Sequence, residues 1–450
     1  MSQVWCESAL VDGRPQRDVT IEILDGRFAA IDVGAHVGAA PPGATRLAGF
    51  TIPGLANAHS HAFHRALRSR TQADRGTFWT WRELMYRAAE RLTPDSSHRL
   101  ARAVFAEMAL AGVTCVGEFH YLHHQPDGTP YADPNAMGEA MLAAADEAGI
   151  RLTLLDTLYL HGGLGPDGYA APADAQRRFS DGSAEAWIQR IEDLAASGTH
   201  RLGGAIHSVR AVDPRAAQVV GEWTGAHQMP LHAHVSEQVA ENEACRDHHG
   251  VTPVRLLSEA GVLTDRFSAV HATQLEADDL KLLGAAGATV VMCPTTERDL
   301  GDGIGPTAAL ADENVTIALG SDSHAVIDLF EEARAVELDE RLRSRRRGTH
   351  TAADLLTMAT ANGHRGLGWD DAGTIAVGQR ADLVTVALDS VRTAGTPSTA
   401  VVETTVFAAT ASDVTDVFVD GRHLVQDRHH ATVDVTRELD ACITELMDDD

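Results

Sequence analysis

The most constraining feature of this sequence is an alternation that repeats between residues 52 and 372. Short apolar segments, typical of buried strands, alternate with Ala- and Leu-rich segments of helical pattern, such as SSHRLARAVFAEMALAG. The apolar segments lie at 49–61, 113–120, 150–161, 202–208, 230–237, 267–273, 288–296 and 315–323. Eight strand and helix pairs predict an α/β fold, a (β/α)8 barrel of the TIM type with parallel strands.

A doubly wound open sheet is the alternative fold for such an alternation. That fold usually has a Gly-rich phosphate-binding loop after its first strand. The first apolar segment ends instead in NAHSHAFHR, which contains three histidines and no glycine. The sequence therefore favours the closed barrel, in which active-site residues lie at the carboxyl ends of the strands.

The two ends of the chain have a different pattern, made of short strands and tight turns. Asp12-Gly13, Asp25-Gly26 and Asp420-Gly421 are dipeptides that accept the positive φ of two-residue hairpins. Residues 373–390 and 416–426 also have strand and hairpin patterns, and we expect no helix between them.

These patterns predict how the chain is divided into domains. Residues 1–51 and 373–430 are expected to pair into one small β-sandwich domain. Residues 52–372 are expected to form the barrel, and residues 431–450 a helical, acidic tail.

Charge and cysteine content exclude several classes of function. The chain has 64 acidic and 37 basic residues, a formal net charge of -27, whereas nucleic acid and anionic membranes require a basic face. Its five cysteines have no C-x-x-C spacing, so they indicate neither a disulfide framework nor a thiolate zinc site. Because we find no signal-peptide pattern and no apolar run long enough to span a bilayer, we expect a cytoplasmic protein.

Metal-binding residue types recur where apolar segments end. They are His59 and His61 in the first segment, His232, His234 and Glu237 in the fifth, His271 in the sixth and Asp322 in the eighth. Residues two apart on a strand share one face, and the carboxyl ends of barrel strands meet at one rim. Imidazoles and a carboxylate at one point form a site that suits Zn²⁺, with Fe²⁺, Co²⁺ or Ni²⁺ possible.

The other histidines need a separate interpretation, because 23 histidines produce some pairs by chance. We interpret His123 with His124, and His429 with His430, as structural. The remaining candidates differ from these pairs because they recur at equivalent positions of one repeat: His59, His61, His234, His271 and Asp322.

These motifs resemble the amidohydrolase superfamily of metal-dependent hydrolases and deaminases, and the resemblance covers nearly the whole chain. The shared motifs are H-x-H after the first strand, H-x-x-E on the fifth, histidine on the sixth and SDS on the eighth. Within the superfamily, four further motifs resemble the formimidoylglutamate deiminases, which hydrolyse N-formimidoyl-L-glutamate to N-formyl-L-glutamate and ammonia in histidine degradation. These motifs are FWTWRELMYR, EFHYLHH, HSVRAV and LGDGIGP.

The resemblance implies one divalent metal ion per subunit, with Zn²⁺ favoured, bound by four ligands: His59, His61, His234 and Asp322. Binuclear members usually bridge two ions with a carbamylated lysine on strand four. The only lysine of this chain is Lys281, which follows the sixth strand in a helical segment. A single metal ion is therefore the favoured arrangement.

Three residues are predicted to be catalytic. A bound Zn²⁺ lowers the pKa of its water to about 7, which makes hydroxide available near neutrality. Asp322 is expected to take the water proton, and His271 to orient the water. Glu237 is expected to carry a proton to the departing nitrogen. The alternative role for Glu237 is to orient His234.

The resemblance also places residues around the substrate, a small dicarboxylate: Arg82, Tyr121, His207 and Arg210. Arginine suits this task, because its planar guanidinium binds a carboxylate through two hydrogen bonds. His64 departs from the family pattern, which has glutamine at that position, so its contact with the substrate is an open question. The resemblance further implies a homodimer.

Two alternatives remain, a related enzyme and a protein of another functional class. The first is a deaminase of a ring amine, such as guanine or an adenosine derivative, which would use the same metal ligands but has no need of two arginines. The second is a scaffold protein that keeps the fold without the reaction. Such a protein would be expected to lack some metal ligands, and none is missing here.

Overall fold

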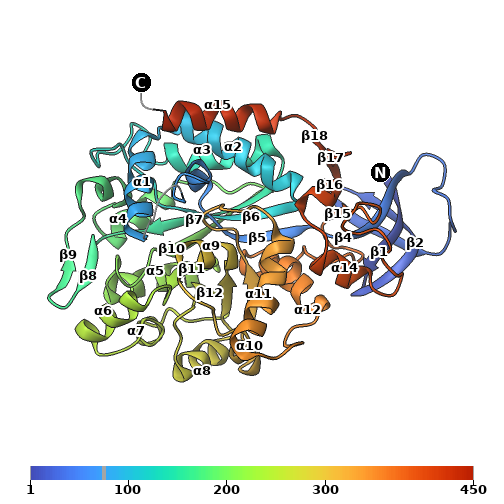
Figure 1. Cartoon of the computed structure of the whole chain (residues 1–450). Helices are drawn as coiled ribbons and strands as arrows, with labels where there is room; N and C mark the ends of the chain where they lie inside the picture. Colours follow the sequence, from blue (N-terminus) through green and yellow to red (C-terminus); the bar gives the residue numbers. More distant parts are fainter. Residues whose placement is uncertain (1, 73–77, 449–450) are drawn as a thin grey trace.

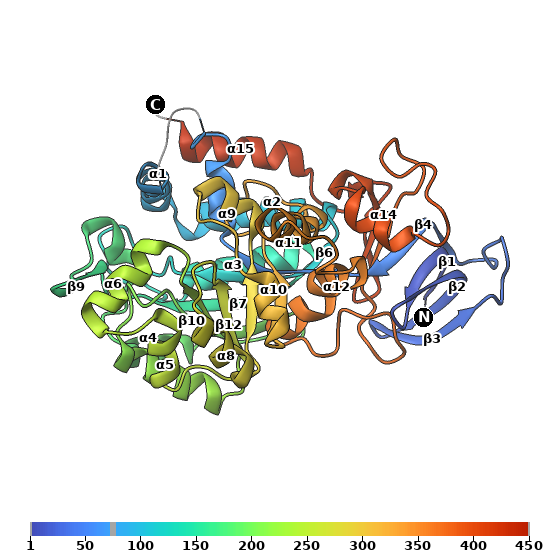
Figure 2. The ribbon, with the colours of Figure 1, turned by 60° about the horizontal axis from the view of Figure 1, so that its bottom comes forward.

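The computed structural model describes residues 2–72 and 78–448, which form a barrel and a smaller sheet beside it (Figure 1). Both ends of the chain contribute to the smaller sheet. Figure 2 shows from a second direction that the blue amino-terminal strands and the orange-red segment around α14 lie together at one side of the barrel.

The larger sheet confirms the predicted barrel. Its eight strands are hydrogen-bonded in the order β14-β13-β12-β11-β10-β7-β6-β5, and every neighbouring pair is parallel. Each strand overlaps one of the eight apolar segments: β5 (Leu55–Ser60), β6 (Val113–His120), β7 (Arg151–Leu158), β10 (His200–Ile206), β11 (Leu231–Val235), β12 (Phe267–His271), β13 (Thr289–Met292) and β14 (Thr316–Leu319). All eight residues of β6 are buried, as expected for a parallel strand covered on both faces.

Backbone pairing closes the barrel between its first and last strands. The Asp322 N–H donates to the His59 carbonyl at 3.0 Å, and the His61 N–H donates to the Asp322 carbonyl at 3.2 Å. Ser60 and Asp322 accordingly form a parallel bridge. The segment after β14 therefore lies directly beside the end of β5.

Helices connect the barrel strands and cover the outside of the sheet. Between β5 and β10 they are η1 (Ala62–Leu67), α1 (Phe78–Arg91), α2 (Pro94–Leu110), α3 (Ala136–Ala148), η2 (Asp174–Phe179) and α4 (Ala184–Ile191), with a small hairpin of β8 (Gly163–Gly165) and β9 (Gly168–Ala170). Between β10 and β14 they are α5 (Pro214–Ala226), α6 (Val239–His249), α7 (Pro253–Glu259), α8 (Ala277–Ala286), α9 (Pro294–Leu300) and α10 (Thr307–Asp312). After β14 follow α11 (Leu329–Ser344), α12 (Ala352–Thr357), the π-helical turn η3 (Met358–Asn362) and α13 (Gly363–Gly366).

The start of α2 shows how the sequence fixes a helix boundary. Thr93 accepts a hydrogen bond from the Ser96 N–H, and the Ser96 side chain accepts one from the Thr93 N–H. Pro94 occupies the first helical position, where its missing N–H costs nothing.

The smaller sheet has eight strands in the order β18-β17-β16-β15-β4-β1-β2-β3. They are β1 (Ser2–Val11), β2 (Arg14–Leu24), β3 (Arg27–Val33), β4 (Thr45–Pro53), β15 (Leu383–Val386), β16 (Val414–Val419), β17 (Arg422–Gln426) and β18 (His429–His430). The sheet curls, because Phe28 on β3 exchanges backbone hydrogen bonds with Gln379 and Gly378 near β15. Phe28, Leu383 and Phe418 consequently share one apolar core.

The three predicted hairpin turns are confirmed. Asp12, Asp25 and Asp420 have φ of 47°, 49° and 46°, and a glycine of positive φ follows each one. One expectation for this region is wrong, because α14 (Val401–Phe407) and the short turn η4 (Ala411–Asp413) lie between β15 and β16. Sequence patterning missed α14 because its apolar residues pack against the barrel helices α11 and α12, a tertiary contact.

A glycine separates the two sheets where one apolar segment had been expected to form one strand. β4 runs to Pro53 and belongs to the smaller sheet, whereas β5 begins at Leu55 in the barrel. A Cβ on Gly54 would lie 2.2 Å from the Thr114 Oγ1 and 2.7 Å from the Asp382 Cβ, so only glycine fits there. The predicted domain bounds, with their division between residues 51 and 52, stay a prediction.

The carboxyl-terminal helix α15 (Val435–Met447) packs along α2 (Figure 1). Arg99 on α2 forms two hydrogen bonds with the Glu445 carboxylate on α15. Among residues 2–72 and 78–448, the helices are all too short or too polar to cross a lipid bilayer.

A buried ion pair joins the barrel to the smaller sheet. The Arg151 guanidinium on β7 donates two hydrogen bonds to the Asp382 carboxylate, and both side chains are almost fully buried. Burial alone would raise the pKa of Asp382, but the positive charge of Arg151 holds it below its usual value. The Asp382 carboxylate also accepts the Asp420 N–H, so the pair fixes the β16–β17 turn to the barrel.

We expect Arg151→Met to lower the free energy of unfolding by about 3–5 kcal/mol, because it leaves the Asp382 charge buried without its partner. Urea unfolding followed by circular dichroism measures the change. Arg99→Met is the control, since it removes an exposed ion pair and is expected to cost about 1 kcal/mol or less. Equal losses in the two variants would contradict the role assigned to burial.

Candidate metal centre and substrate pocket

The predicted metal-binding side chains converge at the carboxyl ends of the barrel strands. His59 stands on β5, His234 on β11 and His271 at the end of β12. His61 directly follows β5, and Asp322 lies in the segment after β14, bridged to Ser60. Two groups of potential ligand atoms overlap at Asp322, and within each group all atoms lie within 4.8 Å of one another. The first group is His59, His234, His271 and Asp322, and the second is His61, His64 and Asp322.

The Asp322 carboxylate lies at the centre of this cluster. Its Oδ1 is 3.2 Å from the Nε2 of His59 and 3.4 Å from the Nε2 of His61. The Nε2 of His234 is 3.2 Å from the Nε2 of His59. The predicted ligands His59, His61, His234 and Asp322 are therefore brought together around one point.

The imidazoles of His61 and His234 each have a hydrogen bond at Nδ1, on the side of the ring away from the cluster, and this bond fixes the tautomer. The Nδ1 of His61 is 3.0 Å from the Phe119 carbonyl oxygen, and the Nδ1 of His234 is 2.9 Å from the His207 carbonyl oxygen. A carbonyl accepts only an N–H, so both rings carry hydrogen on Nδ1 and have a bare lone pair on Nε2. This lone pair faces Asp322 in His61 and the Nε2 of His59 in His234. Lone pairs and a carboxylate that face one another are the donor set a divalent cation requires, so the residues present fit such a metal ion.

Burial keeps these imidazoles neutral. Burial, together with the proximity of the His59 imidazole, lowers the pKa of His61 to about 3. Burial also lowers the pKa of His59 and places that of His234 well below its usual value. For Asp322, burial would raise the pKa, but the hydrogen bond from His59 and the surrounding imidazoles hold it well below its usual value. Neutral imidazoles and an ionised carboxylate are the protonation states in which these groups bind metals.

Two residues of the site have a strained backbone. His271 has φ of 68° and Asp322 has φ of 41°, in the left-handed region that non-glycine residues rarely occupy. Such strain is tolerated where surrounding contacts hold the backbone in that conformation, and it is common at functional sites.

Glu237 and His271 face one another beside the cluster. The Nε2 of His271 lies 3.9 Å from the Glu237 Oε1 and 3.9 Å from the Asp322 Oδ2. Burial lowers the pKa of His271, but the carboxylates of Glu237, Glu297 and Asp322 together raise it to about 10. The catalytic candidates thus lie beside the candidate ligands, while their proposed roles stay predictions.

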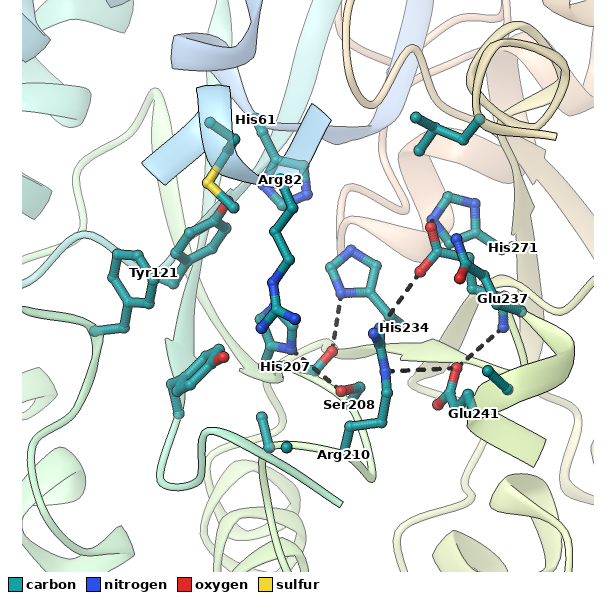
Figure 3. A pocket seen from close by; sticks show the side chains of 18 of the residues that line it. His61, Arg82, Tyr121, His207, Ser208, Arg210, His234, Glu237, Glu241 and His271 are labelled. Carbon is teal, nitrogen blue, oxygen red and sulfur yellow. Dashed lines mark hydrogen bonds and ion pairs between the residues drawn. The ribbon is translucent and has the colours of Figure 1, made fainter. Parts of the chain in front are cut away.

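A cavity of about 220 Å³ opens directly above the cluster. All five predicted substrate-binding residues line it: His64, Arg82, Tyr121, His207 and Arg210. Figure 3 shows Arg82, from α1, and Arg210, from the loop after β10, entering the cavity from opposite sides near His207. The Arg82 Nε donates to the Tyr86 hydroxyl at 2.6 Å.

His64 has a definite environment in this structure. Its Nε2 lies 3.1 Å from the Tyr121 hydroxyl, and its ring centroid is 4.6 Å from that of His61. Burial and the proximity of His61 lower the pKa of His64 well below its usual value. A neutral His64 beside Tyr121 presents a polar group at the cavity wall.

Two buried carboxylates of the site were not identified from the sequence. The Glu241 Oε2, on α6, accepts the Glu237 N–H at 3.2 Å and lies 4.0 Å from the Arg210 Nε (Figure 3). The Glu297 Oε1, on α9, lies 3.5 Å from the Nδ1 of His271. Sequence signals existed for both, since Glu241 lies in the first turn of the helix that follows Glu237, and Glu297 lies in the helix that follows the seventh strand.

Comparison with known proteins gives consistent matches over nearly the whole chain. The pattern of the amidohydrolase family matches residues 50–424. Formimidoylglutamate deiminase from Pseudomonas aeruginosa is 38% identical over 446 residues, which cover 96% of each chain. The 5-methylthioadenosine/S-adenosylhomocysteine deaminase of Natronomonas pharaonis is 30% identical over 406 residues, 88% of this chain and 86% of that protein. The crystal structure of an amidohydrolase from Brucella melitensis superposes with a TM-score of 0.89 at 32% identity, covering 100% of both chains.

We expect Zn²⁺ to raise the thermal unfolding midpoint of metal-free protein, because an ion that binds only the folded state stabilises it by mass action. His234→Asn removes one Nε2 lone pair and is expected to abolish most of this shift and to lower the zinc content. Lys281→Ala, on the exposed face of α8, is the control and should behave as wild type. An undiminished shift in His234→Asn would exclude His234 as a ligand.

Proposed function

Because this chain belongs to the amidohydrolase family, we propose that it is a metal-dependent deiminase that converts N-formimidoyl-L-glutamate and water to N-formyl-L-glutamate and ammonia. Family membership and the 38% identical relative support a hydrolase that acts on C–N bonds of a small molecule. The proposal adds the identity of the substrate. In a cell this reaction would belong to histidine degradation.

The proposed cofactor is one divalent cation per chain, with Zn²⁺ favoured, and its ligands would be His59, His61, His234 and Asp322. Three imidazoles and a carboxylate suit this ion. When bound, a divalent zinc ion acts as a Lewis acid and lowers the pKa of a water molecule to about 7. Lys281 does not offer a bridge to a second ion, since it lies on α8 and pairs with Asp278 at 3.0 Å.

The proton transfers are assigned to residues beside the cluster. The Asp322 carboxylate would accept a proton from the water that attacks the formimidoyl carbon, and His271 would orient that water. Glu237 would deliver a proton to the nitrogen that leaves as ammonia, so that the C–N bond breaks as the new C=O bond forms. The position of Glu237 in the cavity wall, with its Oε1 3.9 Å from the Nε2 of His271, supports this role.

The observation that carries the substrate assignment is the pair of arginines in one cavity. Arg82 and Arg210 line the same space next to the histidine cluster, in a protein of net charge -27. A substrate with two carboxylates would pair with both guanidiniums, while Tyr121 and His207 would contact its middle. Arg210 also lies 3.4 Å from Glu237. The same guanidinium would therefore contact both the substrate and the proposed catalytic carboxylate.

The alternative substrate is a purine amine, since a deaminase of this kind is 30% identical. A neutral purine would bring no carboxylate to either guanidinium. The scaffold alternative is disfavoured, because all four candidate metal ligands are present and meet.

We expect the zinc-loaded protein to release ammonia from N-formimidoyl-L-glutamate, and far less from guanine or 5-methylthioadenosine at equal concentration. A coupled glutamate dehydrogenase assay measures the ammonia. Release from a purine alone would replace the proposed substrate, and release from none of them by metal-loaded protein would contradict the deiminase function.

Arg210→Ala is expected to lower kcat/KM for N-formimidoyl-L-glutamate by about 30-fold to several thousand-fold. The loss of one partner in a desolvated charge pair costs about 2–5 kcal/mol. The variant should keep its zinc, as measured by atomic absorption. Arg215→Ala, an exposed arginine at the start of α5, is the control, and near-normal kinetics in Arg210→Ala would remove Arg210 from the substrate site.

A further inference from the structure

The side chain of Glu297 is buried next to the catalytic candidates and has no role in the reaction as proposed. It lies on α9, which follows β13, and the residue is 3% exposed. Its Oε1 accepts the Cys293 N–H at 2.9 Å and lies 3.5 Å from the Nδ1 of His271. A carboxylate buried so completely requires polar partners. The Cys293 N–H is one, and the His271 Nδ1, which makes no hydrogen bond within the described residues, lies at ion-pair distance.

The imidazole of His271 can turn about its Cβ–Cγ bond, so its direction depends on the groups around it. His271 ends β12 with φ of 68°, and Ala272 after it has φ of 51°, so the chain turns sharply here. The Nε2 of His271 faces Glu237 and Asp322, each at 3.9 Å. A rotation of the ring about its Cβ–Cγ bond would direct Nε2 away from both carboxylates.

We propose that Glu297 is a positioning residue for His271, which it holds by accepting the Nδ1–H so that Nε2 stays directed at the reacting water. The expected effect of this role on turnover rests on the proposed deiminase function. The separation of 3.5 Å is long for a hydrogen bond, and such contacts in unliganded sites commonly shorten when the substrate is bound. Glu297 thereby couples the seventh strand to the sixth.

Glu332 is a matched control that separates positioning of His271 from a purely structural role of Glu297. Glu332, on α11, is equally buried, and its carboxylate accepts the N–H and the hydroxyl of Thr295 on α9. Both glutamates therefore anchor the start of α9. Of these two described residues, only Glu297 lies within ion-pair distance of His271.

Glu297→Gln preserves the volume of the side chain and removes its charge. We expect kcat to fall about 10- to 100-fold, the range typical when a residue that orients an active-site group is lost. KM and zinc content should stay unchanged, since Glu297 does not line the cavity. Glu332→Gln should stay within about threefold of wild type, because it leaves His271 in place. Unchanged kcat in Glu297→Gln, or equal losses in the two variants, would overturn the proposal.

A double-variant cycle tests whether Glu297 acts through His271. In the His271→Asn background, Glu297→Gln is expected to cause no further loss of kcat, because the residue that it positions is already gone. Losses that multiply would show an independent role and overturn the proposal.

A measurement without turnover separates this proposal from the proposed function. In zinc-loaded wild type, the imidazole Nδ1–H proton of His271 should give a downfield NMR signal that disappears in His271→Asn. The signal should move upfield in Glu297→Gln and stay in place in Glu332→Gln. An unmoved signal would overturn the positioning role even if the enzyme deiminates formimidoylglutamate, whereas absent ammonia release with a shifted signal would overturn only the proposed function.

Discussion

The pairing of Asp322 with the end of β5 is the interaction on which the rest of the structure depends. The same two backbone hydrogen bonds, to the His59 carbonyl and from the His61 N–H, close the barrel and place a carboxylate between two imidazoles. Because the Asp322 carboxylate is buried, it is stable only among those partners. Closure of the sheet and assembly of the candidate metal centre therefore depend on each other.

Charge is distributed to suit the proposed chemistry. The protein is strongly acidic, yet Arg82 and Arg210 line the cavity above the cluster. Buried carboxylates limit the freedom of Arg210, which lies near both Glu237 and Glu241. A guanidinium whose position is already fixed loses less conformational entropy when it binds an anion such as the proposed dicarboxylate.

Much of the fold could be predicted from local patterns. The eight apolar segments became the eight barrel strands, and each Asp-Gly dipeptide turned a hairpin, because both signals depend on neighbouring residues. The helix α14 and the break at Gly54 were missed. Packing between distant segments decides both features, since α14 lies against barrel helices and Gly54 is confined by Thr114 and Asp382.

By itself, the sequence determined which side chains stand at the strand ends, because the two-residue period of a strand places His59 and His61 on one face. It also determined that their carboxyl ends share a rim, since parallel strands of a barrel all point one way. Only the tertiary structure decided the partners of those side chains. The carbonyls of Phe119 and His207 that fix two imidazoles, and the carboxylates of Glu241 and Glu297, come from other elements of the barrel. Contacts across a closed sheet join residues far apart in the chain, and no local spacing specifies which of them meet.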